Sequence, residues 1–396
     1  MEFLKLKECL DRFVNDYNTP GVDCIVYREH QPIFRYFAGV RDLETGKKID
    51  GDELYFIFSM TKMLTCTCAL QLFEKGAYKM DDPISIYLPE FEKMKVSVKK
   101  LVTDNANKIA TGEMTGEPVY EKITVDAENP ITVKDLFTMQ GGLDYAISAP
   151  YITEAIEKGK RSTRDLVGAM ANTVLGFEAG TRYRYSLCHD VLGALIEVWS
   201  GMKLGEYMKK NLFLPLGMKD TAFARTIEDE RLSRMATRYQ YDENKVPQKC
   251  SLTCAYTLSD EYESGGAGLV SSTADYALFL DALANGGVGS SGCRILKEET
   301  VKMMGTNQLS GKSAEDFYKM RPGYGYGLGV RVHMNPDVSG SLSPVGEFGW
   351  DGAAGAFSLV DMKNKISLTY FQHIHSWDLK IQSELKNALY TDIDNG

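Results

Sequence analysis

Long uninterrupted apolar runs are absent from this chain of 396 residues. A helix that crosses a bilayer needs roughly 20 consecutive apolar residues, and no such stretch occurs. The N-terminal segment also lacks the apolar core and the small-residue cleavage site of a signal peptide. We therefore expect a soluble, cytoplasmic protein that has no membrane partner.

Clusters of positive charge are missing too. The net charge is −9, and no run rich in Lys and Arg stands out, which argues against nucleic acid as a partner. The five histidines form no H-E-x-x-H motif, and the eight cysteines form no C-x-x-C pair. We expect free, buried thiols, and neither a metal site nor a cofactor.

Segments rich in β-forming residues lie near both ends of the chain. Residues 21–29 and 32–42 predict a hairpin, and residues 356–374 predict two strands around a polar turn. Strands at both ends with helices between them indicate one sheet that is built from N-terminal and C-terminal pieces.

Helical periodicity fills most of the chain between these strands. An apolar helix is expected over residues 60–75, and a last helix over about 376–391. We predict an α/β domain with a central antiparallel sheet, made of residues 1–76 and 226–396. Residues 77–225 are expected to form a mainly helical domain inserted into it.

Ser59 stands three residues ahead of Lys62, at the start of the predicted helix 60–75. On a helix this spacing puts both side chains on one face, and the free N–H groups of a helix N-terminus can hold an anion. A desolvated lysine could then act as a base. The alternative is that Ser59 caps the helix while Lys62 reaches solvent. Spacing alone cannot decide, because it recurs at Ser97/Lys100, Ser200/Lys203 and Ser383/Lys386.

Two later segments favour a catalytic site. The tripeptide YSL at 185–187 directly precedes an apolar helical segment. The tripeptide WDG at 350–352 opens a β-rich run, where glycine permits close approach of the backbone to a ligand. Each alone is explained by a core tyrosine or a strand-end aromatic, but their order behind Ser59 argues for a shared function.

With these motifs in this order, the chain resembles the serine β-lactamase-related superfamily, in particular its class C-like branch of family VIII carboxylesterases and acyltransferases. The resemblance covers nearly the whole chain and includes the segments FEKGAYKMDDPISIYLPEF, ITVKDLFTMQGGL, LFLPLGMKDTAF, GGAGLVSSTADYALFLDALANGG and YGYGLGV. It implies an α/β (α+β) fold of the β-lactamase/transpeptidase type, in which helices flank an antiparallel sheet.

The resemblance also implies a role for each matching residue. Ser59 would be the nucleophile that accepts the acyl group, Lys62 its activating partner, and Tyr185 the second base and proton carrier. The backbone N–H groups of Ser59 and Ala353 would form the oxyanion hole. The cycle would acylate Ser59 and then pass the acyl group to water or another acceptor.

The chain departs from the penicillin-active members at the positions expected to bind substrate. Trp350 and Asp351 stand ahead of Gly352 where those members carry Lys and Thr, and Leu187 replaces a common Asn. The expected site therefore offers the flat apolar ring of Trp350 and the negative charge of Asp351, which favours esters over substrates with a carboxylate. His189 is a candidate polar neighbour, but we expect a structural role for it.

The resulting hypothesis is a serine hydrolase or acyltransferase that acts on esters of small apolar acyl groups. The motif G-x-S-x-G of other hydrolases is absent. One alternative is a β-lactamase or a D-aminopeptidase/DD-peptidase-like amide hydrolase, and a second is an inactive binding protein of the same fold. The expected partner is a small-molecule ester or amide, with a homo-oligomer left open. Residues 99–130 could be a loop that shapes the cleft.

Overall fold

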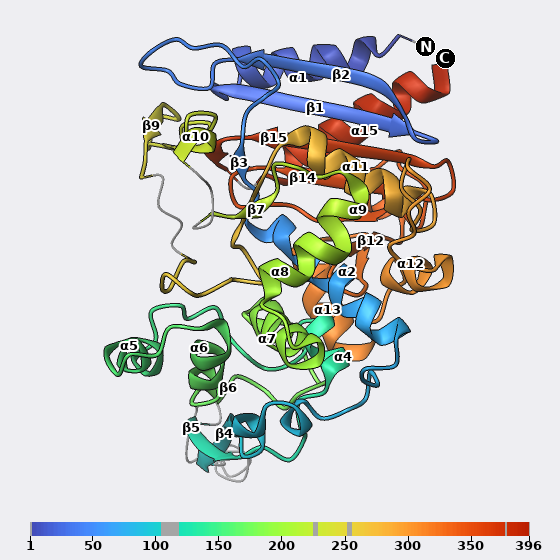
Figure 1. Cartoon of the computed structure of the whole chain (residues 1–396). Coiled ribbons are helices and arrows are strands. Elements are labelled where there is room, and N and C mark those ends of the chain that lie inside the picture. The colour runs from blue at the N-terminus through green and yellow to red at the C-terminus, as the bar shows by residue number, and fades with distance from the viewer. Residues whose placement is uncertain (1, 104–118, 225–228, 252–255, 377, 396) are drawn as a thin grey trace, which may run out of the picture.

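A seven-stranded antiparallel sheet forms one end of the computed structural model, which describes residues 2–103, 119–224, 229–251, 256–376 and 378–395. Figure 1 shows this sheet in the upper half of the molecule, with both chain ends beside it. In spatial order, its strands are β11 (Tyr324–Tyr326), β12 (Arg331–His333), β13 (Phe348–Gly349), β14 (Phe357–Asp361), β15 (Ile366–Gln372), β1 (Gly21–Arg28) and β2 (Gln31–Gly39).

The two ends of the chain meet inside this sheet. Strand β1 pairs with β2 on one side and with β15 on the other, both in antiparallel register. All residues of β14 and β15 are buried, which explains why both strands read as apolar runs. The predicted hairpin, the two C-terminal strands and the fold class are therefore confirmed.

Helices cover both faces of the sheet. On one face, α1 (Leu4–Asn15) and α15 (Leu379–Asn395) lie side by side and bury apolar residues against β1, β14 and β15. Helix α11 (Thr273–Ala284) packs on the other face, against β1, β14 and β15. The Asp392 carboxylate of α15 accepts hydrogen bonds from the backbone N–H groups of Lys5 and Leu6 and so connects α15 to α1. Helix α15 starts later than the predicted 376 and runs further.

Helix α2 (Thr61–Glu74) lies below the sheet in Figure 1 and packs against α7 (Cys188–Ser200). Every residue of α2 from Thr61 to Leu72 is buried, so this helix is central to the larger apolar core. The other α-helices of the described residues are α4 (Val133–Phe137), α5 (Pro150–Glu157), α6 (Thr163–Met170), α8 (Leu204–Met208), α9 (Leu214–Leu216), α10 (Asp229–Leu232), α12 (Glu298–Met304), α13 (Gly311–Met320) and α14 (Pro336–Ser339). Short 3-10 helices span Ile84–Ile86 and Pro89–Phe91, and a π-helix spans Lys209–Phe213. The predicted domain boundaries at 76/77 and 225/226 stay a prediction.

Three small sheets complete the described secondary structure. They are β3-β10-β7, β16-β8-β9 and β5-β4-β6. Their strands are β3 (Tyr55–Phe56), β4 (Lys95–Thr103), β5 (Val119–Asp126), β6 (Val174–Leu175), β7 (Ala222–Phe223), β8 (Tyr239–Tyr241), β9 (Pro247–Lys249), β10 (Leu269–Ser271) and β16 (Ile374–His375).

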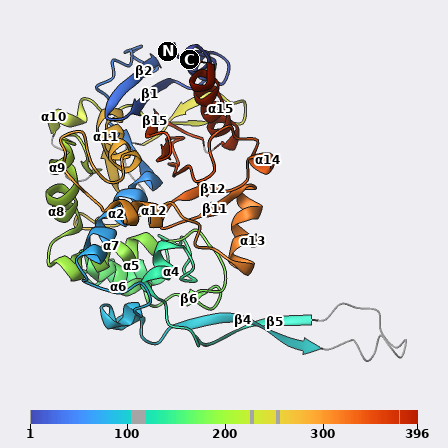
Figure 2. The same cartoon turned by 90° about the vertical axis from the view of Figure 1, so that its right-hand side faces the viewer.

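The described residues of segment 99–130 belong largely to a hairpin. Strands β4 and β5 pair in antiparallel register, and Figure 2 shows them projecting from the body of the molecule. The hypothesis that this segment shapes the cleft is wrong for its described residues, because none of them lines the pocket reported below. Residues 104–118 lie outside the described part of the chain.

The cysteines agree with the expectation of free thiols as far as they are described. Seven are free, and five of these are buried: Cys9, Cys24, Cys66, Cys68 and Cys188. The eighth, Cys254, lies outside the described residues. Within the described ranges, no helix has the length and apolarity needed to cross a membrane.

Candidate active site

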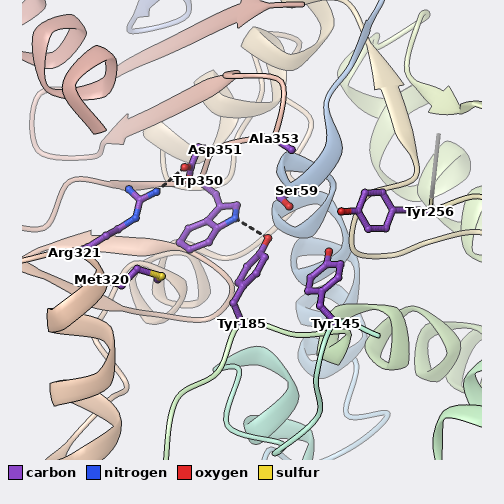
Figure 3. Close-up of a pocket in the computed structure, with 10 residues that line it drawn as sticks. Ser59, Tyr145, Tyr185, Tyr256, Met320, Arg321, Trp350, Asp351 and Ala353 are labelled. Carbon is purple, nitrogen blue, oxygen red and sulfur yellow. Dashed lines mark hydrogen bonds and ion pairs between the residues drawn. The ribbon is translucent and has the colours of Figure 1, made fainter. Parts of the chain in front are cut away.

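A pocket of about 460 Å³ opens where α2 begins, beside the segment that follows β13. Figure 3 shows Ser59 at its centre, with aromatic side chains arranged around the serine. The residues that line the pocket are Ser59, Tyr145, Tyr185, Tyr256, Met320, Arg321, Trp350, Asp351, Gly352 and Ala353. The pocket thus joins six of the positions expected from the sequence: Ser59, Tyr185, Trp350, Asp351, Gly352 and Ala353.

Ser59 is held in a tight turn that connects β3 to α2. The turn is a short 3-10 helix, Phe58–Met60, and Phe58 has a φ of +44°, a conformation that L side chains rarely adopt. The Phe58 ring is buried and packs edge-on against His375, with ring centres 5.1 Å apart. Because no side chain caps α2, the alternative that Ser59 serves as its cap is wrong.

Lys62 is buried completely and faces Ser59. Its Nζ lies 3.4 Å from Ser59 Oγ and 3.1 Å from the hydroxyl oxygen of Tyr145, and it donates to the carbonyl oxygen of Gly266 at 2.7 Å. Three partners in a closed environment fix the position of the amine. The alternative in which Lys62 reaches solvent is therefore wrong.

Burial lowers the pKa of Lys62 from 10.5 to about 8, although the negative charge of Asp190 opposes this shift. Asp190 is itself buried, and its Oδ1 accepts hydrogen bonds from Tyr262 at 2.7 Å and from Ser264 at 2.6 Å. With a pKa of about 8, roughly one Lys62 amine in ten is neutral at pH 7. The amine is thus available as a base near neutral pH.

Two tyrosines enclose this amine. The rings of Tyr145 and Tyr185 are stacked with centres 5.5 Å apart, and Lys62 Nζ lies 4.6 Å from the centre of the Tyr185 ring. Burial raises the pKa of both phenols well above the ordinary value, so both are protonated at neutral pH. Each phenol can therefore donate a proton to a group that develops negative charge.

Tyr145 was missed by the reasoning from sequence. It lies two residues beyond ITVKDLFTMQGGL, one of the stretches that resemble the family, and nothing in that pattern marks the tyrosine as functional. Its closeness to Lys62, at 3.1 Å, becomes visible only in three dimensions. Tyr256, Met320 and Arg321 were missed for the same reason.

The WDG segment at 350–352 forms the wall of the pocket next to Ser59. Trp350 is stacked on Tyr185 with ring centres 5.6 Å apart, and its Nε1 donates to the Tyr185 hydroxyl oxygen at 3.3 Å. A Cβ on Gly352 would lie only 2.5 Å from the carbonyl oxygen of Ile57, so a side chain cannot fit there. Figure 3 shows Ala353 beside Ser59, at the same end of α2.

Asp351 does not add the net negative charge that the sequence suggested. Its Oδ2 lies 2.6 Å from Nη2 of Arg321, and both side chains are about 3% exposed. The amide of Gln382 also donates to this oxygen, at 2.9 Å. The ion pair leaves the pocket wall electrically balanced.

Besides the buried Lys62, two expected positions lie outside the pocket lining. Leu187 is the N-cap residue of α7, where its side chain is buried in the core and its N–H donates to the carbonyl oxygen of Asp144. His189 is fully buried, and its Nε2 lies 3.3 Å from the carbonyl oxygen of Phe137. Burial lowers the His189 pKa to about 3, so the ring stays neutral. These contacts agree with a structural role for His189.

Comparison with known proteins places the chain among enzymes of related chemistry. The Beta-lactamase family model matches residues 6–386. An uncharacterized protein from Mycobacterium tuberculosis (strain CDC 1551 / Oshkosh) is 28% identical, over 87% of this chain and 83% of its own length. Esterase EstB from Burkholderia gladioli is 26% identical, over 90% of this chain and 86% of its own.

Solved structures give the same fold. EstCE1, a hydrolase with promiscuous acyltransferase activity, superposes with a TM-score of 0.77 at 22% sequence identity. The superposition covers 98% of this chain and 97% of EstCE1. The family resemblance that the motifs indicated is therefore confirmed, together with the fold.

Proposed function

The chain belongs to the Beta-lactamase family, and from this premise we propose that it is a serine hydrolase with acyl-transfer capacity that works through an acyl intermediate on Ser59. Its proposed substrates are esters with small, apolar acyl groups. The observation that carries the proposal is the short path from Ser59 Oγ to the buried Lys62 amine, 3.4 Å long.

Acylation begins with proton transfer. The neutral form of Lys62 accepts the proton of the Ser59 hydroxyl while Oγ attacks the carbonyl carbon of the ester. A tetrahedral oxyanion forms and is stabilised by the backbone N–H groups of Ser59 and Ala353. Because such donors are fixed before the reaction, they stabilise the developing charge without reorganising.

Collapse of the tetrahedral intermediate breaks the bond between the carbonyl carbon and the alcohol oxygen. The departing alkoxide needs a proton, and the phenols of Tyr145 and Tyr185 are neutral donors beside the lysine. Lys62 then returns the proton it took from Ser59 to the tyrosine that donated. The alcohol leaves, and the acyl group stays on Ser59.

Deacylation repeats these steps with a second nucleophile. Water, or an alcohol in the case of acyl transfer, gives its proton to the same basic group and attacks the acyl carbon. The bond from that carbon to Ser59 Oγ then breaks, and Oγ takes back a proton from the basic group. Hydrolysis and transfer differ only in the acceptor.

Two features of the pocket support esters over β-lactams and peptides. Trp350 presents an aromatic ring where the penicillin-active relatives carry a lysine. The cation of the pocket lining, Arg321, is already in contact with Asp351. An uncharged, apolar ester therefore meets complementary surfaces there.

The decisive experiment is covalent labelling with a fluorophosphonate, followed by intact mass and peptide mapping. The wild-type chain is expected to gain one adduct on Ser59 and to hydrolyse short p-nitrophenyl esters, and Ser59→Ala is expected to lose both. Ser97→Ala, which removes a serine of the same spacing to lysine, is the matched control and should keep both.

The same experiment separates the alternatives. An unlabelled wild-type chain would favour the inactive binding protein, and full ester turnover by Ser59→Ala would exclude the acyl-Ser59 mechanism. Hydrolysis of a chromogenic cephalosporin at a rate that rivals ester turnover would favour the β-lactamase or peptidase alternative.

A further inference from the structure

Arg321 and Asp351 form a closed, buried contact in the wall of the candidate pocket. Nη2 of Arg321 lies 2.6 Å from Oδ2 of Asp351. Gln382 of α15 completes a ring of three, since it accepts from Arg321 Nη1 at 3.0 Å and donates to Asp351 Oδ2 at 2.9 Å. Figure 3 shows the ion pair next to Trp350.

A guanidinium in such a wall is a strong site for carboxylates. Its planar fork of N–H donors matches a carboxylate oxygen pair, and burial strengthens the attraction. Removing one partner of a buried ion pair leaves a charge that is costly to bury alone, and a ligand of opposite charge can replace that partner. Asp351 is therefore the internal occupant of a site that a substrate carboxylate would otherwise fill.

The position of the ion pair indicates a role in substrate selection as well as in the fold. Both residues line the pocket together with Ser59. The Arg321 guanidinium lies 5.2 Å from the centre of the Trp350 ring, so a group that rests against this indole is also next to the arginine. Asp351 directly precedes Gly352, in the connection between β13 and β14 that carries the proposed oxyanion donor.

We infer that Asp351 is a specificity-determining residue, which occupies Arg321 and so excludes esters that carry a carboxylate. The inference rests on the proposed function and adds the class of substrate that the site rejects. In this arrangement the chain carries a latent carboxylate site, and one carboxyl group of its own keeps that site closed.

Two esters of equal acyl length test the inference. One is p-nitrophenyl valerate, which is neutral, and the other is the mono-p-nitrophenyl ester of glutaric acid, which ends in a carboxylate. The measured quantity is the ratio of kcat/KM for the glutarate ester to kcat/KM for the valerate ester. The wild-type ratio is expected to lie below one tenth, and Asp351→Asn is expected to raise it at least tenfold, mainly by lowering KM for the glutarate ester.

Two control variants isolate the arginine. The double variant Arg321→Gln, Asp351→Asn restores the original net charge of the pair, and it should lose the gain seen with Asp351→Asn alone. Gln382→Leu leaves the ion pair in place and should keep the wild-type ratio within threefold. A purely structural defect would lower kcat/KM for both esters by the same factor and leave their ratio unchanged.

The outcomes distinguish this inference from the proposed function. An Asp351→Asn protein that is labelled at Ser59 and hydrolyses the valerate ester, but keeps the wild-type ratio, overturns the inference and leaves the proposed function standing. A wild-type chain that forms no adduct at Ser59 overturns both. If Asp351→Asn does not fold, the wild-type ratio decides, and a value near one overturns the inference.

Discussion

Trp350 and Tyr185 are joined by a hydrogen bond of 3.3 Å, from the indole Nε1 to the phenol oxygen, and their rings are stacked. The two residues lie 165 positions apart in the chain. The wall of the pocket thus holds the tyrosine that stands beside Lys62. We propose that this contact gives Trp350 a second task besides its proposed contact with substrate, because it orients the proposed proton carrier.

Trp350→Phe tests this task. Phenylalanine keeps an aromatic ring but removes the N–H, and a hydrogen bond of this kind contributes about 1 kcal/mol. We expect kcat for p-nitrophenyl butyrate to fall about fivefold while KM changes little. Trp199→Phe, at an indole that is stacked on Tyr78 away from the pocket, is the control. An unchanged kcat in Trp350→Phe would contradict the orienting role.

The rate should depend on pH through Lys62. Acylation needs the neutral amine, and the neutral fraction rises with pH until the pKa of about 8 is passed. We expect kcat/KM to rise about tenfold per pH unit below that value and to level off above it. Initial rates between pH 6 and pH 9.5 measure the profile.

Two lysine variants, one test and one control, accompany the pH profile. Lys62→Met is expected to reduce kcat/KM at least a thousandfold, because the described residues that line the pocket include no amine that could replace it as base. Lys100→Met removes a lysine of the same spacing behind a serine and should leave the profile unchanged. A flat wild-type profile from pH 6 to pH 9 would show that Lys62 is not the base.

Tyr145 and Tyr185 should both matter for catalysis and little for binding. Replacing either by Phe keeps the stacked pair but removes a hydroxyl beside Lys62. We expect kcat to fall about 10²- to 10³-fold in each variant, with KM within threefold, since proton transfer by one group contributes on that scale. Tyr318→Phe, at an exposed tyrosine, serves as the control. A larger loss in Tyr145→Phe than in Tyr185→Phe would make Tyr145 the main proton carrier.

Gly352→Ala should damage the oxyanion hole. The new methyl group would approach the Ile57 carbonyl oxygen to 2.5 Å, so the strand or the turn before Ser59 must shift. Losing one oxyanion donor costs about 10²- to 10³-fold in kcat, and overpacking costs about 1–3 kcal/mol of unfolding free energy. Steady-state kinetics and urea unfolding measure the two effects.

Gly168→Ala is the matched control for this glycine variant. Its new methyl group would lie 3.1 Å from the flexible end of Arg164, on the short helix α6. We expect unchanged kinetics and equal or greater stability, because alanine favours the helix over glycine. Equal kinetics for Gly352→Ala and wild type would contradict the proposed oxyanion hole.

Much of the fold could be predicted because local patterns agree with the final structure. The hairpin of β1 and β2, helix α2 and the strands β14 and β15 all follow apolar periodicity and turn residues. Ser59, Lys62 and Tyr185 carry short motifs in a fixed order, so a resemblance could locate them. The roles of these three residues stay predictions until they are tested.

The rest depends on distances that no local pattern encodes. Tyr145 has no motif of its own, and only the folded chain brings its hydroxyl to within 3.1 Å of the lysine. The pairing of Asp351 with Arg321 cancels the negative charge expected at the wall, because a side chain 30 positions away neutralises it. Leu187 matches a motif position but packs into the core, since its motif also starts a buried helix.

The pairing of β1 with β15 determines when the central sheet can be completed during synthesis. Val22 is matched with Gln372, about 350 residues later in the chain. At a synthesis rate of about 5–20 residues per second, the first strand waits about 20–70 s for its neighbour. During that time the nascent hairpin of β1 and β2 keeps one backbone edge open, so it needs shielding from other nascent chains. Completion of the sheet, and with it the side of the pocket formed by residues 350–352, therefore waits until residue 372 has been synthesised.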